Sequence, residues 1–349
     1  MEKPYYIYGA GSLANFLAPL LNETGFTING IVDDKKVGVN FAGHRVISLQ
    51  ELPPEANLLI CVLNNWVDIS FIRQTAQSIG CDQVLTPPEI FFLLGEKGFN
   101  IDWYWLHSQR SLVESIFTRS SKLLQNRLID DVSKDTFDAI FKYRLNGLIP
   151  SQFIFPEGDQ YFETGFEDFW SGEIGLIDCG SYTGDTLQQI SNRDLDLVEV
   201  LAIEPDSTNF AALRKQIKWL GIKAICLNSA IGSENCVVNF DTRGDSGSRI
   251  SSSAKTSSMV SQIMFDSTFP TSRYSHVKMD IEGSELAALK GMRRLLVDEG
   301  PKLALSVYHK PEDLVTIPDF LINECGYRSF SLRTFANQTF ETILYAVKE

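Results

Sequence analysis

The segment GLIDCGSYTGDT, residues 175–186, decides the fold of the longer part of the chain. Strand-forming residues run up to Asp178, a turn of small residues with Gly180 and Gly184 follows, and a helix is predicted directly after it. A strand, a glycine turn and a helix in this order begin a βαβ unit. Because glycine lets the backbone approach a ligand closely, we expect a ligand to lie beside this turn.

The rest of this part of the chain repeats the alternation. Further strands are expected at residues 200–204, 224–227, 276–280 and 302–308, and helices at residues 186–190, 209–220 and 284–296. Two last strand-like runs, residues 328–332 and 339–347, are separated by a polar turn and predict an antiparallel pair. A parallel series closed by such a pair is a mixed sheet.

The first hundred residues show a similar α/β series, and a different pattern separates the two. Strands are expected at residues 5–8, 26–32, 58–63 and 84–85, with one helix capped by Ser12 and another at residues 68–79. Between about residues 108 and 148, apolar side chains recur at threes and fours, which predicts two or so connector helices. We therefore predict an α/β domain at residues 1–105, a helical connector at 106–159 and a second α/β domain at 160–349.

Composition excludes several classes of function. The chain of 349 residues is 44% hydrophobic and has no long apolar run, so no membrane span is expected. A net charge of −13 argues against a nucleic-acid partner. The six scattered cysteines and the absence of a cleavable leader favour free thiols and a cytoplasmic location. No Cys/His pair has zinc-ligand spacing, so no zinc site is expected. The paired Asp280 and Glu282 would allow a metal, but nothing in the sequence requires one and none is predicted; a homo-oligomer is compatible with the sequence.

Both α/β series place an acidic residue at the same distance from a glycine turn. Asp33 follows Gly9 by 24 residues, and Glu204 follows Gly180 by the same 24. In a doubly wound sheet these points are neighbours at the carboxyl edge, where the acid can accept hydrogen bonds from both ribose hydroxyls. Both series are therefore predicted to be able to bind a nucleoside.

The first turn has dinucleotide spacing. Gly9, Gly11 and Ala14 form G-x-G-x-x-A, with Asp33 at the end of the second strand. The start of the following helix would face a pyrophosphate. A tight turn in a degenerate Rossmann-like module would leave the same pattern, and the sequence does not decide between the two.

The second turn favours a different ligand. Asp178 stands two residues before Gly180, and a carboxylate there would repel a diphosphate. It suits a cationic head such as an ammonium group. S-adenosyl-L-methionine combines a nucleoside without phosphates, an amino-acid head and a sulfonium, and is the cofactor that these residues favour.

Five ordered blocks then make this part of the chain recognisable. They are LIDCGSYTGDT, LAIEPDSTNFAALRKQI, LNSAIGSE, HVKMDIEGSELAALKGMRRLL and PKLALSVYHKPEDL. Over residues 160–349 they resemble the FkbM-type family of S-adenosylmethionine-dependent methyltransferases. The resemblance implies the seven-stranded class I methyltransferase fold and, usually, O-methylation. Ser181 departs from the alanine that is common in the family.

The first hundred residues resemble the Rossmann-like amino-terminal domains of sugar acyltransferases and nucleotide-sugar enzymes. Together the two resemblances imply O-methylation of a sugar hydroxyl in a glycan or nucleotide-sugar precursor, with a small-molecule or glycan substrate. One rival hypothesis is a nucleotide-ligand-binding or docking protein whose methyltransferase-like domain is not catalytic. A third, an NAD(P)-dependent oxidoreductase built on residues 9–33, lacks a recognisable catalytic residue nearby.

The resemblance assigns residues to parts of the cofactor. The methionine portion is expected to contact residues of the second glycine turn, namely Asp178, Gly180, Ser181 and Gly184. Glu204 is expected to bind the ribose hydroxyls, with Pro205 and Asp206 shaping the adjoining loop. The adenine is expected beside the residues that follow the third strand, namely Ser229, Ala230 and Ile231.

Three more residues are candidates for the methyl-transfer chemistry. Asp280 and Glu282 follow a parallel strand at the edge where such sheets bind ligands, although they could also serve only to cap the next helix. His309 follows the next strand and is expected to act as a general base with an ordinary imidazole pKa, or merely to end its strand. The serine-rich segment at residues 242–258 is either a flap over a site or a surface excursion.

Overall fold

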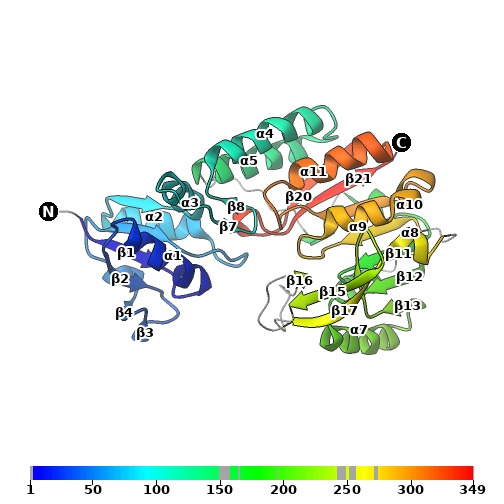
Figure 1. Cartoon of the computed structure of the whole chain (residues 1–349), viewed down its shortest axis with the longest axis horizontal. Coiled ribbons are helices and arrows are strands. Elements are labelled where there is room, and N and C mark those ends of the chain that lie inside the picture. Colours follow the sequence, from blue (N-terminus) through cyan, green and yellow to red (C-terminus); the bar gives the residue numbers. More distant parts are fainter. Residues whose placement is uncertain are drawn as a thin grey trace. The chain divides into compact units, whose positions relative to one another are not determined.

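The computed structural model describes residues 3–148, 158–163, 166–193, 195–241, 249–250, 257–270 and 274–348. The chain forms two compact units, each built from several segments (Figure 1). Unit 1 comprises Met1–Arg119, Lys134–Phe155 and Thr334–Glu341; unit 2 comprises Ser120–Ser133, Pro156–Arg333 and Thr342–Glu349. The predicted domain boundaries near residues 105 and 159 stay predictions.

Unit 1 contains a six-stranded sheet in the order β3-β4-β2-β1-β5-β6. Its strands are β1 (Tyr5–Tyr8), β2 (Ile28–Val32), β3 (Asn40–Phe41), β4 (His44–Ile47), β5 (Asn57–Ile60) and β6 (Gln83–Leu85). Its helices include α1 (Ser12–Glu23), α2 (Ile69–Ile79) and α3 (Pro87–Glu96), and β7 (Asp102–Trp103) pairs with β8 (Leu106–His107). The strands from β4 to β6 pair in parallel, as the alternation predicts, while β3 is antiparallel to β4.

Helix α3 is the longest of the elements of unit 1 that sequence reasoning missed, and β3, β4, β7 and β8 are the others among the strands and α-helices described above. Pro87 and Pro88 form the first turn of α3, where a missing backbone N–H is tolerated. Thr86 and Glu89 cap this helix reciprocally, with the Thr86 backbone N–H donating to Glu89 Oε2 at 2.8 Å. The letters TPPE therefore mark a helix start.

The two expected connector helices are present as α4 (Arg110–Leu124) and α5 (Asp131–Asn146). Each contributes residues to both units, because the unit boundaries fall at residues 119 and 133. Within unit 1, Phe117, Phe137 and Phe141 form an aromatic cluster in which two of the ring pairs have centroids 5.0 Å apart. The apolar periodicity of this segment thus marks helices that help to build a core.

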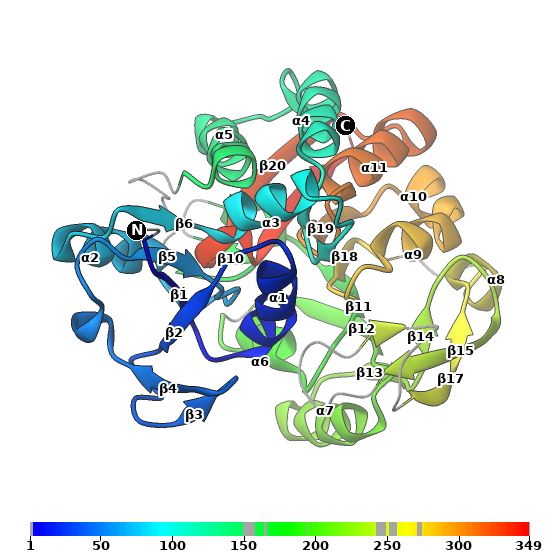
Figure 2. The same ribbon diagram turned by 60° about the vertical axis from the view of Figure 1, so that its left-hand side comes forward.

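Unit 2 contains a seven-stranded sheet in the order β13-β12-β11-β18-β19-β21-β20 (Figures 1 and 2). Its strands are β11 (Ile174–Cys179), β12 (Leu197–Ile203), β13 (Ala224–Leu227), β18 (His276–Met279), β19 (Lys302–Ser306), β20 (Ser329–Thr334) and β21 (Thr342–Val347). The strands from β13 to β19 pair in parallel, and β21 is antiparallel to β19. Every residue of β11 is buried, which makes this strand the centre of the core.

The helices of unit 2 are α6 (Asp185–Ser191), α7 (Ser207–Leu220), α8 (Phe265–Thr268), α9 (Glu285–Gly291), α10 (Arg293–Asp298) and α11 (Asp313–Phe320). A second sheet has the order β14-β17-β15-β16, with β14 (Ala230–Ile231), β15 (Cys236–Asp241), β16 (Arg249–Ile250) and β17 (Ser257–Ile263). A small hairpin pairs β9 (Gly158–Asp159) with β10 (Phe162–Glu163). The single helix predicted at residues 284–296 is divided into α9 and α10 around Met292.

The α/β class with mixed sheets, predicted from the sequence, is confirmed by this architecture. Residues 242–248 and 251–256 of the serine-rich segment lie outside the described residues, so its predicted role stays a prediction. Every helix in the described ranges is too short or too polar to cross a lipid bilayer.

Candidate active site

The sequence-predicted residues of unit 2 gather at one edge of its main sheet. Along the sheet order, Ser229 follows β13, Glu204 follows β12, Asp178 lies near the end of β11, Asp280 follows β18 and His309 comes after β19. Because these neighbouring strands are parallel, their carboxyl ends meet at the same edge, where α/β sheets bind ligands. The topology therefore places residues from distant parts of the sequence next to one another.

The turn after β11 needs glycine for two reasons. Gly180 has a φ of +76°, and a Cβ atom there would lie 1.9 Å from the backbone oxygen of Asp280. Gly184 also has a positive φ, +91°, at the N-cap of α6. Glycine was predicted here to clear room for a ligand; the structure adds that the turn is packed directly against the backbone that follows β18.

The side chain of Ser181 is used inside the turn. Its Oγ donates to the backbone oxygen of Asp178 at 2.8 Å and accepts from the backbone N–H of Ile203 at 3.2 Å. These two bonds join the ends of β11 and β12. Its predicted contact with the methionine portion of a cofactor stays a prediction.

A buried ion pair lies beneath this turn. Asp178 is fully buried and Lys278 of β18 is 4% exposed, with Nζ 3.1 Å from Asp178 Oδ1. Lys278 Nζ also donates to the backbone oxygen of Gly180 at 2.7 Å. Burial raises the pKa of Asp178 despite the nearby lysine. Burial alone would lower the pKa of Lys278, but the Asp178 carboxylate outweighs it and holds that pKa above its usual value.

Lys278 changes the interpretation of Asp178. The sequence argument treated this carboxylate as a partner for the cationic head of a ligand. The structure supplies an internal counter-ion that sequence reasoning missed. Asp178 Oδ2 is buried and makes no hydrogen bond with the described residues.

Glu204 is buried beside the glycine turn. It accepts hydrogen bonds from the backbone N–H groups of Tyr182 and Asp206, each at 2.9 Å. Burial raises its pKa to about 7, although both hydrogen bonds oppose this. An ionised carboxylate can accept about four hydrogen bonds, so two positions remain for other donors such as ribose hydroxyls.

Asp206 has the structural role expected for the adjoining loop. Its side chain caps α7 by accepting from the backbone N–H groups of Thr208 and Asn209, at 2.8 and 2.9 Å. The backbone oxygen of Pro205 accepts from Asn228 Nδ2 at 3.0 Å. These bonds fix the loop that carries Glu204.

The residues predicted near adenine are buried but lie in different elements. Ser229 follows β13 as expected, and its Oγ makes no hydrogen bond with the described part of the chain. Ala230 and Ile231 form β14, which pairs in parallel with Gln262 and Ile263 of β17 in the second sheet. Their contact with adenine stays a prediction.

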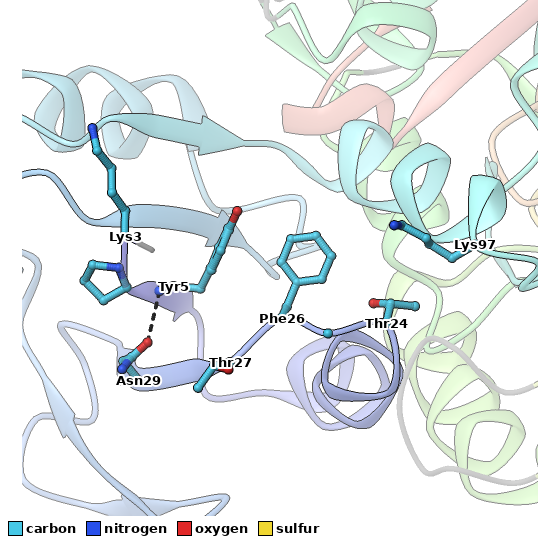
Figure 3. Close-up of a pocket in the computed structure, with 9 residues that line it drawn as sticks. Lys3, Tyr5, Thr24, Phe26, Thr27, Asn29 and Lys97 are labelled. Atoms are coloured by element: carbon cyan, nitrogen blue, oxygen red, sulfur yellow. Dashed lines mark hydrogen bonds between the residues drawn. The ribbon is translucent and has the colours of Figure 1, made fainter. Parts of the chain in front are cut away.

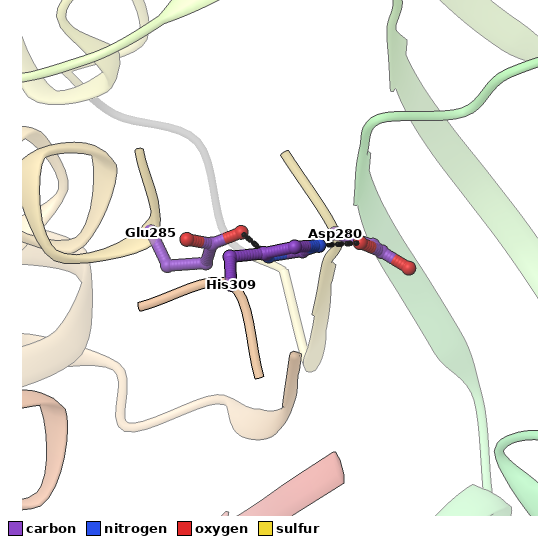
Figure 4. A group of neighbouring side chains, drawn as sticks. All are labelled: Asp280, Glu285 and His309. Atoms are coloured by element: carbon purple, nitrogen blue, oxygen red, sulfur yellow. Dashed lines mark hydrogen bonds and ion pairs between the residues drawn. The ribbon is translucent and has the colours of Figure 1, made fainter. Parts of the chain in front are cut away.

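Asp280, Glu282, Glu285 and His309, named here the histidine cluster, meet beyond β18 and β19. Figure 4 shows Asp280, Glu285 and His309 of this cluster. His309 Nδ1 lies 2.9 Å from Glu285 Oε1, and Nε2 lies 3.4 Å from Asp280 Oδ1 and 3.7 Å from Glu282 Oε1. Figure 4 shows the imidazole between Glu285 and Asp280. The structure thus brings together the three predicted residues and adds Glu285.

Glu285 is a fully buried acid that sequence reasoning did not single out. Its Oε1 accepts from the backbone N–H groups of Ile281 and Gly283, at 3.0 and 3.3 Å, as well as from His309. Glu285 lies in the first turn of α9, where an acidic residue usually has no role beyond its favourable interaction with the positive end of the helix. Its position next to a histidine 24 residues later could not be deduced from local sequence.

The charge of His309 differs from the expectation. Burial lowers its pKa, but Glu285, Glu282 and Asp280 outweigh burial and raise the pKa well above its usual value. Burial likewise raises the pKa of Glu285, and His309 with the backbone donors lowers it overall. The pKa of His309 is therefore above the ordinary imidazole value that was expected, which favours the protonated ring over the neutral form that a general base needs.

Asp280 has further neighbours on its other oxygen. The hydroxyl groups of Tyr161 and Tyr308 lie 3.4 and 3.5 Å from Asp280 Oδ2. Its carboxylate is partly exposed, unlike the buried imidazole beside it. Asp280 is thus held between His309 and two tyrosines while remaining accessible.

In the predicted nucleotide turn of unit 1, the acidic residue Asp33 binds the backbone of the turn itself. Gly9 has a φ of +104°, and Ala14 is buried inside α1. Asp33 Oδ2 accepts from the backbone N–H of Ala10 at 2.9 Å, so the acid holds the turn itself. The N-cap of α1 is Gly11, which corrects the expectation of a Ser12 cap.

A pocket of about 430 Å³ in unit 1 lies elsewhere (Figure 3). Its lining includes Lys3, Tyr5, Phe26 and Lys97, at the end of β1 opposite to Gly9. Lys3 is paired there with Asp82 at 2.8 Å. This pocket gives no support to a nucleotide at the Gly9 turn, whose ligand stays a prediction.

Comparisons with known proteins bear on the family and the fold of the chain. Residues 178–329 match a family model described as the Methyltransferase FkbM domain, which confirms the predicted resemblance for this part of the chain. The crystal structure of methyltransferase FkbM from Methylobacillus flagellatus KT has a TM-score of 0.76 at 23% identity, covering 99% of this chain and 90% of that one. The whole described chain therefore shares its fold.

Weaker structural matches cover about half of the chain. An rRNA methylase from Streptococcus thermophilus has a TM-score of 0.33 at 12% identity, covering 52% of this chain and 91% of that one. Aeropyrum pernix fibrillarin, in complex with S-adenosyl-L-methionine, has a TM-score of 0.33 at 10% identity, covering 51% and 67%. At these scores neither carries a further argument. No curated protein sequence matches the chain significantly.

Proposed function

We propose that unit 2, which carries the FkbM-type methyltransferase domain at residues 178–329, transfers a methyl group from S-adenosyl-L-methionine to a hydroxyl oxygen. One observation carries this proposal: the glycine turn after β11 and the acid after β12 are joined directly, because the Tyr182 N–H donates to Glu204 at 2.9 Å. The turn can hold an amino-acid head while the acid holds a ribose, at the separation that one nucleoside cofactor needs.

In this proposal each residue of the turn has a defined part. Asp178 Oδ2 accepts from the ammonium group of the cofactor, while Lys278 keeps the buried carboxylate ionised from its other side. Glu204 accepts from the ribose hydroxyls with the positions that its backbone donors leave open. Ser229 Oγ, buried and without a hydrogen bond inside the described residues, is offered to the adenine.

Methyl transfer is an in-line displacement at carbon, so the protein mainly positions the acceptor oxygen against the methyl group. The histidine cluster supplies that position, because the Asp280 backbone touches the Gly180 turn. We assign the acceptance of the hydroxyl proton to Asp280, whose carboxylate is accessible, rather than to the protonated His309. His309 and Glu282 then orient Asp280 and the acceptor.

The sheet order, the features of unit 1 and the family resemblance support the fold class and the acceptor that we propose. The order of the main sheet, with β21 antiparallel beside a parallel series, supports the class I methyltransferase fold. The parallel strands and glycine turn of unit 1 support a Rossmann-like domain that recognises the acceptor. A sugar hydroxyl of a glycan or nucleotide-sugar precursor is the acceptor that the family resemblance and the appearance of unit 1 favour.

Calorimetry on the full chain tests the proposal. S-adenosylmethionine and S-adenosylhomocysteine should bind at one site per chain, and NAD(P) should not displace them. Radiolabelled methyl transfer to a panel of nucleotide sugars and free glycans then identifies the acceptor. A folded chain that binds NAD(P) but neither adenosyl ligand would refute the proposal.

A further inference from the structure

We propose that Asp280, Glu282 and His309 bind one divalent metal ion, and that Glu285 orients the histidine toward it. The metal ligands would be Asp280 Oδ1 and Glu282 Oε1, both near the imidazole, and His309 Nε2. The part that the ion plays in methyl transfer rests on the proposed function, whereas the site itself rests only on these side chains.

The distances from the imidazole nitrogen to the two carboxylate oxygens suit a common ion. His309 Nε2 lies 3.4 Å from Asp280 Oδ1 and 3.7 Å from Glu282 Oε1. With metal–ligand bonds of about 2.1 Å, these separations correspond to angles of about 110° and 120° at the ion. Both angles lie within the range of tetrahedral and five-coordinate sites.

The imidazole itself gives an independent indication. Its side chain is 2% exposed, and Nε2 faces the two carboxylates without making a hydrogen bond in the described part of the chain. A buried ring nitrogen without a hydrogen bond is uncommon, because leaving it so costs about 1–3 kcal/mol. A metal ion between Nε2 and the carboxylates would give this nitrogen a bonding partner.

Glu285 has the position of a supporting carboxylate. Metal-binding histidines usually donate their other ring N–H to a carboxylate or carbonyl, which fixes the tautomer and the ring orientation. His309 Nδ1 lies 2.9 Å from Glu285 Oε1, and this oxygen is held in turn by the backbone N–H groups of Ile281 and Gly283. The ring is thus locked with Nε2 directed toward Asp280 (Figure 4).

The charge of the cluster also favours a cation. Asp280, Glu282 and Glu285 bring three carboxylates around one imidazole. Lys278, the buried cation nearby, is paired with Asp178. A divalent ion is the kind of ligand that such a group of carboxylates and an imidazole attracts.

The donor set indicates the class of metal and its use. One imidazole with two carboxylates suits Mn²⁺ or Zn²⁺ better than Mg²⁺, which prefers oxygen alone. The ion would bind the acceptor hydroxyl and lower its pKa. The oxygen then forms a bond to the methyl carbon as the carbon–sulfur bond breaks, giving a methyl ether, S-adenosylhomocysteine and one proton, which leaves to solvent.

Metal titration of the full chain tests the inference. After treatment with EDTA and desalting, the protein is titrated with MnCl₂, ZnSO₄ and MgCl₂ by calorimetry, without cofactor or acceptor. We expect one Mn²⁺ or Zn²⁺ per chain, at least tenfold weaker binding in Asp280→Asn and His309→Ala, and a 10- to 100-fold loss in Glu285→Gln. His44→Ala, which removes a histidine of β4 in unit 1, should bind the metal like the wild type.

The outcomes separate this inference from the proposed function. Equal metal binding by the wild type and by Asp280→Asn overturns the site, whereas methyl transfer that EDTA leaves unchanged overturns only the part proposed for the ion in the reaction. Metal binding in a chain that binds no S-adenosylmethionine upholds the site and refutes the function. Asp280 is partly exposed, so Asp280→Asn keeps the test valid if the buried His309→Ala fails to fold.

Discussion

The affinity for S-adenosylmethionine should depend on pH through Glu204. Burial raises the pKa of this carboxyl to about 7, so about half of the ligand-free chains carry it protonated at neutral pH. Ribose hydroxyls donate hydrogen bonds to the ionised form, so binding must first remove that proton. Cofactor affinity should therefore be complete above pH 8 and fall as the pH drops through 7.

The size of the effect follows from the titration. With a pKa of about 7, the ionised fraction is about 90% at pH 8 and about 10% at pH 6. Affinity should fall about tenfold between these values, which is about 1.4 kcal/mol. At pH 7 binding should release about half a proton, measurable by calorimetry in buffers with different ionisation enthalpies.

Two variants make the assay specific. Glu204→Ala should weaken binding at pH 8 by about 1.5–3 kcal/mol and abolish the pH dependence, because the charge-assisted hydrogen bonds are lost. Asp206→Asn removes a charge from the same loop while keeping a good helix cap, and should retain wild-type affinity and pH dependence. A wild-type affinity that is flat from pH 6 to 8, or a folded Glu204→Ala with normal affinity, would refute the ribose assignment.

Three further predictions concern the fold of the site and unit 1. Lys278→Met should destabilise the chain by about 3–5 kcal/mol in urea unfolding, because it leaves Asp178 charged and buried, and adding Asp178→Asn should restore much of the loss. Gly180→Ala should cost more stability than Gly221→Ala, since both have positive φ but only Gly180 faces a backbone oxygen at 1.9 Å; equal losses would contradict the close-packing argument. The full chain should oxidise no NAD(P)H with any aldehyde or sugar offered, and a measurable turnover would revive the oxidoreductase hypothesis for residues 9–33.

The parts of the site that sequence predicted are those fixed by strand topology. Gly180 and Glu204 have the spacing of a turn and an acid in a doubly wound sheet, and parallel strands end at one edge of such a sheet. These two features predict that the glycine turn, Asp280 and His309 lie at the same edge. Helix α3 was missed although its capping letters were visible, because a pair of prolines was taken only as a breaker. A pair of prolines can either end a strand or form the first turn of a helix, so the local sequence alone allows both structures.

The parts that sequence could not predict depend on burial and on partners distant in the chain. Lys278 looks in sequence like an ordinary strand residue, and only the fold shows that it neutralises Asp178. The protonation state of His309 is set by Glu285, which lies on a different element. A pKa is a property of an environment, so a motif can locate a titratable residue without giving its charge.

The close packing of Gly180 on Asp280 has a mechanical consequence for methyl transfer. The Asp280 N–H donates to the Cys179 oxygen at 3.0 Å, and its own oxygen occupies the space where a Gly180 side chain would lie. The turn proposed to hold the cofactor and the cluster proposed to hold the acceptor are thus parts of one packed backbone, not separate loops. In-line displacement tolerates little misplacement, and a shift of about 1 Å can cost about 100-fold in rate. Joining the two sides through backbone atoms keeps the sulfonium methyl and the acceptor oxygen aligned without requiring a lid to close.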